Sequence, residues 1–273
     1  MRLGRIAWVN CFPVYGAIDR GVVPCAAELV SGTAAELNDL LAAGTLDVSV
    51  ISAVEYARDA ARYHLLPDLA IAADGPVHSV MLFSKVPPAR LEGASVLRTA
   101  SSRTSVLLLE LLCRHVWQVA PRFAQVRAEA TDLEALAGIP HDAVLVIGDA
   151  ALVLTAQRRY PHVVDLSAAW KAWTGLPFVF AVWAARREAD ERAVQGIHQA
   201  LLASREWGIR HLDTLAAEAS ARTGIPVGVT RDYLGTLEYR LGGAELEGLS
   251  TFFRRLAQDG LAPGGALSFI TAA

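Results

Sequence analysis

The sequence contains little cysteine, no long apolar run and no excess of either charge. Its three cysteines in 273 residues show no CxxC spacing, which excludes a closed disulfide framework and favours a reducing compartment. The longest apolar runs, such as residues 178–185, are the size of a strand and far short of the ~18–20 residues of a membrane-spanning helix. Acids and bases are mixed along the chain, with a net charge of −3. The basic patch expected of a nucleic-acid binder is missing.

Sequence signatures of cofactors and metals are absent as well. There is no GxGxxG after a strand and no P-loop, and the seven histidines form neither an HExxH motif nor a close ligand pair. We therefore expect no dinucleotide, no metal and no other cofactor.

The first residues carry two cations, like the start of a signal peptide. The apolar stretch that follows spans only Ile6 to Val9 and ends at Asn10, whereas a secretory segment needs ~7–15 apolar residues. This pattern predicts a first β-strand and a cytoplasmic protein.

The apolar fraction of 53% is sufficient for substantial cores, and the length fits two domains or one large α/β domain. Strands alternate with helices over the first sixty residues, which predicts a mostly parallel sheet with helices on both faces. Thr33 and Glu36 have the spacing of a capping box at the start of one helix. The expected strands are 3–9, 26–30 and 46–52, and the expected helices are 34–43 and 53–61.

The pattern changes after residue 69. Two strands, 69–73 and 79–84, precede a proline-rich breaker, and a second series of strands and helices follows up to a strand-like run at 178–183. Its expected members are strands 95–99, 123–128, 143–147 and 163–165, and helices 106–116 and 150–157. Trp170 and Trp173 are expected to flank a loop and to serve in packing. The remainder is expected to be helical over 188–208, 212–222, 230–239 and 245–258.

We therefore predict two α/β lobes. Lobe one comprises 1–84 plus 182–273, and lobe two, 88–178, is inserted into it. Two antiparallel crossings at 81–85 and 178–183 resemble the hinge of a type II periplasmic-binding-protein fold, here with a helical C-terminal part. Ligands of such folds lie in a cleft between the lobes, at strand carboxyl ends and helix N-termini.

Small hydroxyl and amide residues gather at the expected strand ends. Helix N-termini at such an edge present free N–H groups and partial positive charge, which suits carboxylates. The alternative is simple helix capping, the usual role of serine and threonine before a helix, and the sequence leaves both interpretations open. These residues are Asn10, Ser31, Thr33, Ser52, Ser101, Ser102, Thr104 and Ser105.

Four other residues are candidates for a ligand site. His78 precedes an expected crossing strand, Gly148 and Asp149 open a helix as a cap or a site acid, and Phe178 is able to stack on a ring. Cys11 is better explained as a small buried thiol than as a nucleophile, because no partnering histidine is identifiable.

Seven stretches in matching order resemble the MqnA family, the chorismate dehydratases of the futalosine route to menaquinone. They include Ile6–Tyr15, with Asn10, and the His-Ser-Val-Met-Leu-Phe-Ser-Lys run at 78–85. The others are 36–41, 47–56, 65–69, 148–152 and 173–183. The sister enzyme of that route, 1,4-dihydroxy-6-naphthoate synthase, opens with a motif like Ser-Pro-Cys-Pro-Asn-Asp, which this chain lacks.

The resemblance implies that chorismate loses water to give 3-[(1-carboxyvinyl)oxy]benzoate, without metal or redox cofactor. It implies catalytic roles for Asn10 and Ser79, with the substrate's own enolpyruvyl carboxylate or His78 as the base. The expected substrate-binding residues are Ser52, His78, Ser102, Thr104, Ser105, Gly148, Asp149 and Phe178.

The expected partner is the small-molecule substrate chorismate, with neither nucleic acid nor membrane, and no oligomeric state is predicted. Fold does not determine function, so a non-catalytic cytoplasmic binding protein for a small aromatic or carboxylate ligand stays an alternative, as does the sister synthase.

Overall fold

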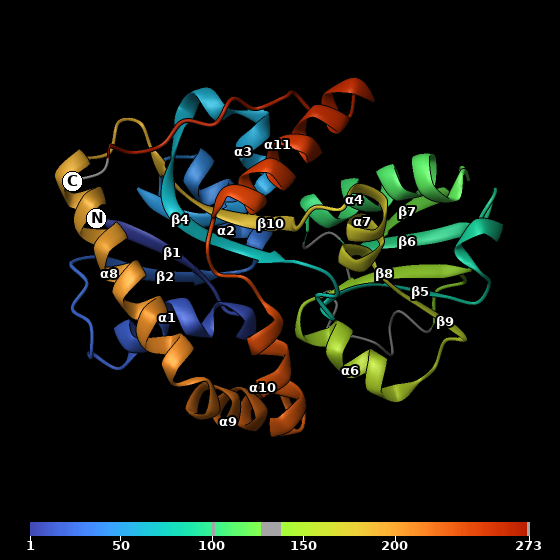
Figure 1. Ribbon diagram of the computed structural model, residues 1–273, viewed down its shortest axis with the longest axis horizontal. Helices are drawn as coiled ribbons and strands as arrows, with labels where there is room; N and C mark the ends of the chain where they lie inside the picture. The colour runs from blue at the N-terminus through green and yellow to red at the C-terminus, as the bar shows by residue number, and fades with distance from the viewer. Residues whose placement is uncertain (100–101, 127–137, 272–273) are drawn as a thin grey trace. The chain divides into compact units, whose positions relative to one another are not determined.

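The computed structural model describes residues 1–99, 102–126 and 138–271 (Figure 1). Contacts along the chain divide it into two compact units. The first unit contains residues 1–72 and 179–273, and the second contains residues 73–178.

The first unit is built on a five-stranded sheet of order β2-β1-β3-β10-β4. β1 pairs in parallel with β2 and β3, and β10 pairs antiparallel with β3. The alternation expected for the first sixty residues is confirmed. The strands are β1 Arg2–Ile6, β2 Glu28–Gly32, β3 Val48–Ser52, β4 Tyr63–Ala73 and β10 Phe178–Arg186, and the helices between them are α1 Phe12–Asp19, α2 Ala34–Ala42 and α3 Ala53–Arg58.

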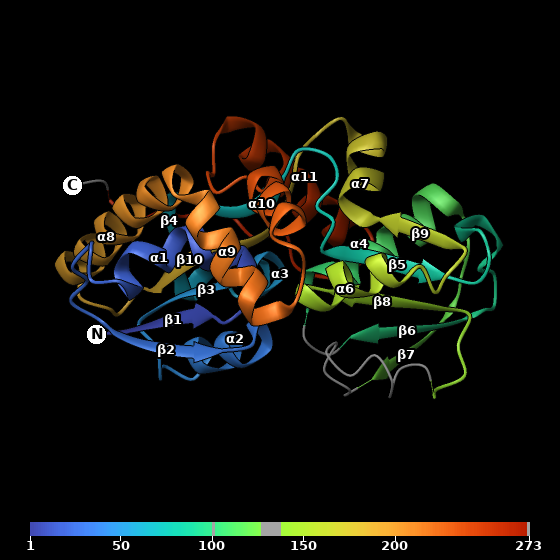
Figure 2. The ribbon, with the colours of Figure 1, turned by 90° about the horizontal axis from the view of Figure 1, so that it is seen from below.

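The C-terminal part is helical, as expected, and belongs to the first unit. α8 lies along α1 in both views (Figures 1 and 2). Its buried positions recur on one face, which includes Val194, Ile197 and Leu201, as an amphipathic helix requires. The helices are α8 Glu191–Arg210, α9 Leu212–Thr223, α10 Val227–Thr236 and α11 Gly243–Gln258.

The second unit is built on a five-stranded sheet of order β7-β6-β8-β5-β9. A core cluster that includes Met81, Phe83, Val144 and Leu154 packs α6 against this sheet. The strands are β5 Val80–Ser84, β6 Ser95–Thr99, β7 Arg122–Val126, β8 Ala143–Ile147 and β9 His162–Asp165. The helices are α4 Thr104–Leu112, continued by a π-helical turn Cys113–Trp117, α6 Asp149–Gln157 and α7 Leu166–Thr174.

The lobe boundary expected between residues 84 and 88 differs from this division. β5 pairs antiparallel with both β8 and β9, so residues 80–84 lie inside the second sheet. The change of unit along the chain falls at Ala72–Ala73 instead.

Several expected element limits were wrong for local reasons. β1 ends at Ile6 and not at residue 9, because Val9–Cys11 forms a 3₁₀ turn. β4 begins at Tyr63, six residues before the expected strand, and continues through Pro67; an edge strand tolerates proline because one side of its backbone needs no partner. The loop expected between Trp170 and Trp173 is instead part of α7. Residues 127–128 of the expected strand 123–128 lie outside the described residues, and the rest of it belongs to β7.

Candidate functional site

One edge of the first sheet collects the segments that follow β1, β2 and β3. These three strands are parallel, so their carboxyl ends meet at the same edge. α2 and α3 begin directly after β2 and β3. Asn10, Thr33 and Ser52 therefore belong to one edge, as the sequence predicts.

Asn10 does not end a strand, contrary to expectation. It lies in the 3₁₀ turn Val9–Cys11 that leads into α1. Its side-chain oxygen Oδ1 is buried and has no hydrogen-bond partner among the residues that the structure describes. Since nearly all buried polar atoms are paired, this acceptor marks Asn10 as a candidate for ligand contact. Its neighbour Cys11 is 1% exposed, which agrees with a buried thiol.

Ser52 is held by a residue that the sequence analysis missed. Asn38 in α2 donates from Nδ2 to Ser52 Oγ at 3.2 Å, and its Oδ1 accepts from Ser52 N at 3.1 Å. Asn38 is completely buried. With its oxygen accepting from Asn38, the Ser52 hydroxyl keeps its own proton for donation. Asn38 shares the buried face of α2 with Leu37 and Leu41, but nothing in that local pattern identifies Ser52 as its partner.

Ser31 and Thr33 are used by the fold itself. Thr33 and Glu36 form the predicted capping box at the start of α2. Ser31 Oγ accepts from the Arg5 guanidinium at 2.9 Å. For Thr33 the capping interpretation is therefore correct.

One edge of the second sheet collects another group of predicted residues. β6 and β8 are parallel, and β5 runs antiparallel to β8 and to β9. The carboxyl ends of β6, β8 and β9 thus meet the amino end of β5 at this edge. α4, α6 and α7 all begin there.

Ser79 and Gly148 are in direct contact at this edge. Gly148 N donates to Ser79 O at 2.7 Å, and Ser79 is 5% exposed. Gly148 has φ 66° and ψ −149° and is the N-cap of α6, a conformation that is essentially restricted to glycine. Asp149 is the first residue of α6 and not its cap, in contrast to the expected capping role.

His78 precedes Ser79 and is exposed. Its φ of +61° is unusual for a residue other than glycine. The N–H groups of Val77 and His78 both donate to Asp165 Oδ2, at 2.8 and 2.7 Å. Asp165 is a second residue that the sequence analysis did not identify.

The hydroxyl residues before α4 have mixed roles. Ser102 Oγ accepts from Ser105 N at 3.1 Å, which is a capping contact. Thr104 and Ser105 are 1% and 3% exposed in the first turn of the helix. Ser101 lies outside the described residues.

Phe178 is part of the packed interior. It is 1% exposed, and its ring packs edge to face on Trp170 with centroids 5.3 Å apart. Trp170 Nε1 donates to Pro177 O at 3.1 Å, so this aromatic pair fixes the chain just before β10.

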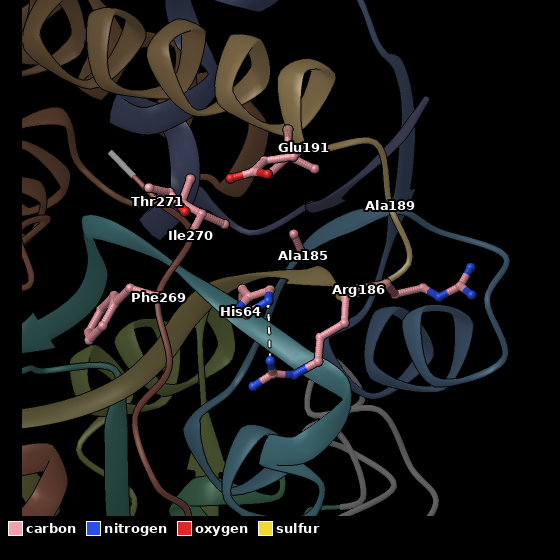
Figure 3. A pocket seen from close by; sticks show the side chains of 10 residues that line it. His64, Ala185, Arg186, Ala189, Glu191, Phe269, Ile270 and Thr271 are labelled. Atoms are coloured by element: carbon pink, nitrogen blue, oxygen red, sulfur yellow. Dashed lines mark hydrogen bonds between the residues drawn. The ribbon is translucent and has the colours of Figure 1, made fainter. Parts of the chain in front are cut away.

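A separate pocket lies in the first unit near the start of α8 (Figure 3). Arg187 and His64 line it and form a hydrogen bond of 3.3 Å, which is dashed in Figure 3. Burial and the positive charge of Arg187 lower the pKa of His64. None of the residues predicted for the site lines this pocket.

Two features are absent from the described residues. No group of three or more His, Cys, Asp or Glu side chains in 1–99, 102–126 and 138–271 is arranged to hold a metal ion. In the same residues, no helix has both the length and the apolar character to cross a bilayer.

Comparison with solved structures defines the class of fold. A structural-genomics protein of Archaeoglobus fulgidus matches with a TM-score of 0.77 at 19% identity, covering 95% of this chain and 97% of that one. The alkanesulfonate-binding protein SsuA of Xanthomonas axonopodis, solved with MOPS, matches with a TM-score of 0.70 at 15% identity, covering 98% and 95%. The chain thus has the α/β fold of the periplasmic binding proteins, as expected.

Sequence comparison then narrows the class to a family. A family model described as menaquinone biosynthesis matches residues 1–258, and the chain belongs to this family. A chorismate dehydratase of Thermus thermophilus is 36% identical over 237 residues, which cover 81% of this chain and 84% of that protein. The expected family membership is confirmed.

Proposed function

We propose that this protein is a chorismate dehydratase, which converts chorismate to 3-[(1-carboxyvinyl)oxy]benzoate and water. The observation that carries the proposal is the 36% identity to the Thermus thermophilus chorismate dehydratase, over most of both chains. Membership of the menaquinone biosynthesis family supports it. A cytoplasmic location is part of the same proposal.

The reaction breaks one C–H and one C–O bond and leaves an aromatic ring. The ring proton beside the ether is acidified through the conjugated carboxylate, and the hydroxyl leaves from the neighbouring carbon. The departing oxygen and the abstracted proton form the water. Aromatisation makes the step strongly downhill, so the enzyme has to bind, orient and stabilise developing charge.

Asn10 is the first proposed catalytic residue. In the chorismate dianion the ring hydroxyl is the only hydrogen-bond donor, because both carboxyl groups are ionised. Asn10 Oδ1, which is buried and has no partner in the part of the chain that the structure describes, is an acceptor, and it suits that hydroxyl better than it suits a carboxylate. Asn10 would thereby orient the leaving group.

Ser79 is the second proposed catalytic residue, as a donor to the departing oxygen or to a carboxylate. Its own carbonyl accepts from Gly148 N, which fixes its backbone. The base is the enolpyruvyl carboxylate of the substrate or the exposed His78.

The remaining candidates are proposed to bind the two carboxylates. The first turns of α4 and α6 offer N–H groups near Ser102, Thr104, Ser105, Gly148 and Asp149, and a helix N-terminus favours an anion. Such contacts hold substrate and transition state alike, so their loss should raise KM more than it lowers kcat. Ser52 would donate through its remaining proton, and Phe178 would support the site through its packing on Trp170.

The test is to incubate the purified protein with chorismate and to follow substrate and product by chromatography. The proposal expects many equivalents of the carboxyvinyloxybenzoate per protein molecule. Binding without turnover would establish a ligand-binding protein instead. Absence of both binding and turnover would favour another step of menaquinone biosynthesis, such as that of the sister synthase.

A further inference from the structure

Asp165 makes more contacts than a helix cap requires. It ends β9 and is the N-cap of α7, where Oδ1 accepts from Ser167 N at 2.9 Å and Ala168 N at 3.1 Å. Capping of this kind needs only one side-chain oxygen, and serine supplies it about as well as aspartate does. The second oxygen, Oδ2, is used differently.

Oδ2 receives two successive backbone N–H groups from a segment almost ninety residues away. Val77 N donates at 2.8 Å and His78 N at 2.7 Å. Successive N–H groups beside a residue in the left-handed region form a concave anion-binding nest, and His78 has φ +61°. The Asp165 carboxylate is the anion that occupies this nest.

The turn formed by Val77 and His78, which Asp165 holds, is followed directly by Ser79. A left-handed conformation costs roughly 1–2 kcal/mol for a residue other than glycine, so His78 needs contacts that maintain it. Ser79 O then accepts from Gly148 N at 2.7 Å. One chain of contacts therefore runs from Asp165 through the 77–78 turn and Ser79 to the N-cap of α6.

A second contact ties the same loop to the same helix. Lys171 Nζ in α7 lies 2.5 Å from Asp74 Oδ1. Both side chains are substantially exposed, so this ion pair contributes little to stability. The loop before β5 is therefore held at its start by Lys171 and at its end by Asp165.

We propose that Asp165 is a positioning residue for catalysis: its carboxylate holds the Val77–His78 turn and thereby fixes Ser79 and Gly148. The inference rests on the proposed function, in which Ser79 acts on chorismate. Asp165 itself makes no contact with substrate in this proposal.

The test variant is Asp165→Ser, which separates the two roles of the side chain. Serine still caps α7 through its hydroxyl, but it is too short to reach Val77 N and His78 N as well. The matched control is Asp190→Ser at the start of α8, where the aspartate caps the helix by accepting from Ala193 N at 2.8 Å, its one side-chain hydrogen bond among the described residues. Both variants exchange one aspartate cap for a serine cap.

Displacement of a catalytic group by about 1 Å costs on the order of 10²-fold in rate. We therefore expect Asp165→Ser to lower kcat by about 10- to 100-fold while KM changes less, roughly 3-fold at most, because the lost interaction acts in the transition state. Asp190→Ser should show wild-type kcat and KM. Asp165→Ser should melt below Asp190→Ser, because Val77 N and His78 N lose their acceptor, and both variants should remain folded at the assay temperature.

Amide hydrogen exchange supplies the readout that a general loss of stability does not give. In Asp165→Ser, exchange should accelerate at residues 77–78 and stay slow at residues 167–168, where the cap remains. Unchanged kcat together with fast exchange at 77–78 would overturn the positioning role. A lowered kcat with unchanged exchange there would overturn it too.

Failure of the proposed function is distinguishable from failure of this inference. If the wild-type protein does not consume chorismate, the dehydratase proposal falls. The exchange measurement still decides whether Asp165 holds the turn, and slow exchange at 77–78 in Asp165→Ser would overturn that part alone.

Discussion

Asn10 and Ser52 belong to the same edge of the first sheet but differ in how their side chains are paired. Ser52 is locked to the buried Asn38 by two hydrogen bonds. Asn10 Oδ1 is buried with no partner among the described residues. An unpaired buried polar atom costs about 1–3 kcal/mol. Such a cost is tolerated where function requires the group, and this supports a catalytic assignment for Asn10.

We predict that Asn10→Ala and Ser79→Ala each lower kcat far more than they lower stability. Loss of one preorganised hydrogen-bonding group costs about 10²–10³ in kcat. Asn10→Ala also removes a buried acceptor that has no partner among the described residues, so its melting temperature should not fall. Turnover of chorismate and thermal unfolding of the same preparations measure both effects.

Ser204→Ala is the control for Ser79→Ala, because it should lower stability and not kcat. Ser204 is fully buried, and its Oγ accepts from Ala17 N at 3.2 Å. Its loss should reduce stability by about 1–3 kcal/mol, because a buried N–H loses its partner, and should leave kcat unchanged. Near-normal kcat in both folded Asn10→Ala and Ser79→Ala would show that the catalytic assignment is wrong, and His78 would be tested next.

At the scale of elements, α1 and α8 pack closely because Gly208 carries no side chain. A Cβ atom built on Gly208 would lie 2.5 Å from Pro13 Cα, a distance at which the backbone of α1 would have to shift. We predict that Gly208→Ala destabilises the protein by about 1–3 kcal/mol, the usual cost of overpacking a tight contact. Urea unfolding monitored by circular dichroism measures this change.

Gly196 in the same helix is the matched control. A Cβ at Gly196 has no heavy atom within 4 Å. Gly196→Ala should therefore stabilise α8 by about 0.5–1 kcal/mol, because alanine is the better helix former. Equal effects of the two substitutions would show that the close crossing at Gly208 does not exist.

Asp68 in β4 belongs to an ion cluster with two arginines. Asp68 has φ +56°, and its carboxylate accepts from Arg205, which is 2% exposed, at 3.0 Å and from Arg240 at 3.2 Å. Burial acts to raise the pKa of Asp68, but the hydrogen bonds from Arg240 and Arg205 outweigh it, so this pKa is lowered. A carboxyl group with a lowered folded-state pKa contributes stability above its unfolded pKa of about 3.9, and this is lost as pH falls through the folded value.

We predict that Asp68→Asn lowers the free energy of unfolding at neutral pH by about 1.5–3 kcal/mol, the worth of hydrogen bonds to charged groups. Asparagine tolerates positive φ, so backbone strain does not add to the effect. The difference from wild type should shrink as the solution is acidified below pH 4. The control is Asp213→Asn in the exposed pair with Arg231, which should cost less than about 1 kcal/mol; an equal loss in both variants would contradict the role of the cluster.

At the scale of the whole molecule, the order of elements could be predicted because it follows from local periodicity. The pairing of strands could not be predicted, since β5 pairs with β8 and β9, which lie far from it in sequence. For this reason the expected lobe boundary differs from the one in the structure. The first half of β4 was not predicted, because Pro67 within it is unfavourable for a strand. In the candidate sites, Asn10 and Ser79 were accessible through family resemblance, whereas Asn38 and Asp165 act through contacts with distant segments that no local pattern reveals.

Cofactor independence is the last prediction, and it follows from the chemistry of the proposed reaction. The dehydration is redox-neutral, and the aromatic product supplies the driving force. Each carboxylate of the substrate needs hydrogen-bond donors, which helix N-termini and hydroxyl groups supply without a Lewis acid. We expect protein treated with a chelator and freed of nucleotides by gel filtration to keep its full kcat on chorismate. Zn²⁺ or Mg²⁺ added back should not increase kcat, whereas a strict metal requirement restored by either ion would refute the proposed mechanism.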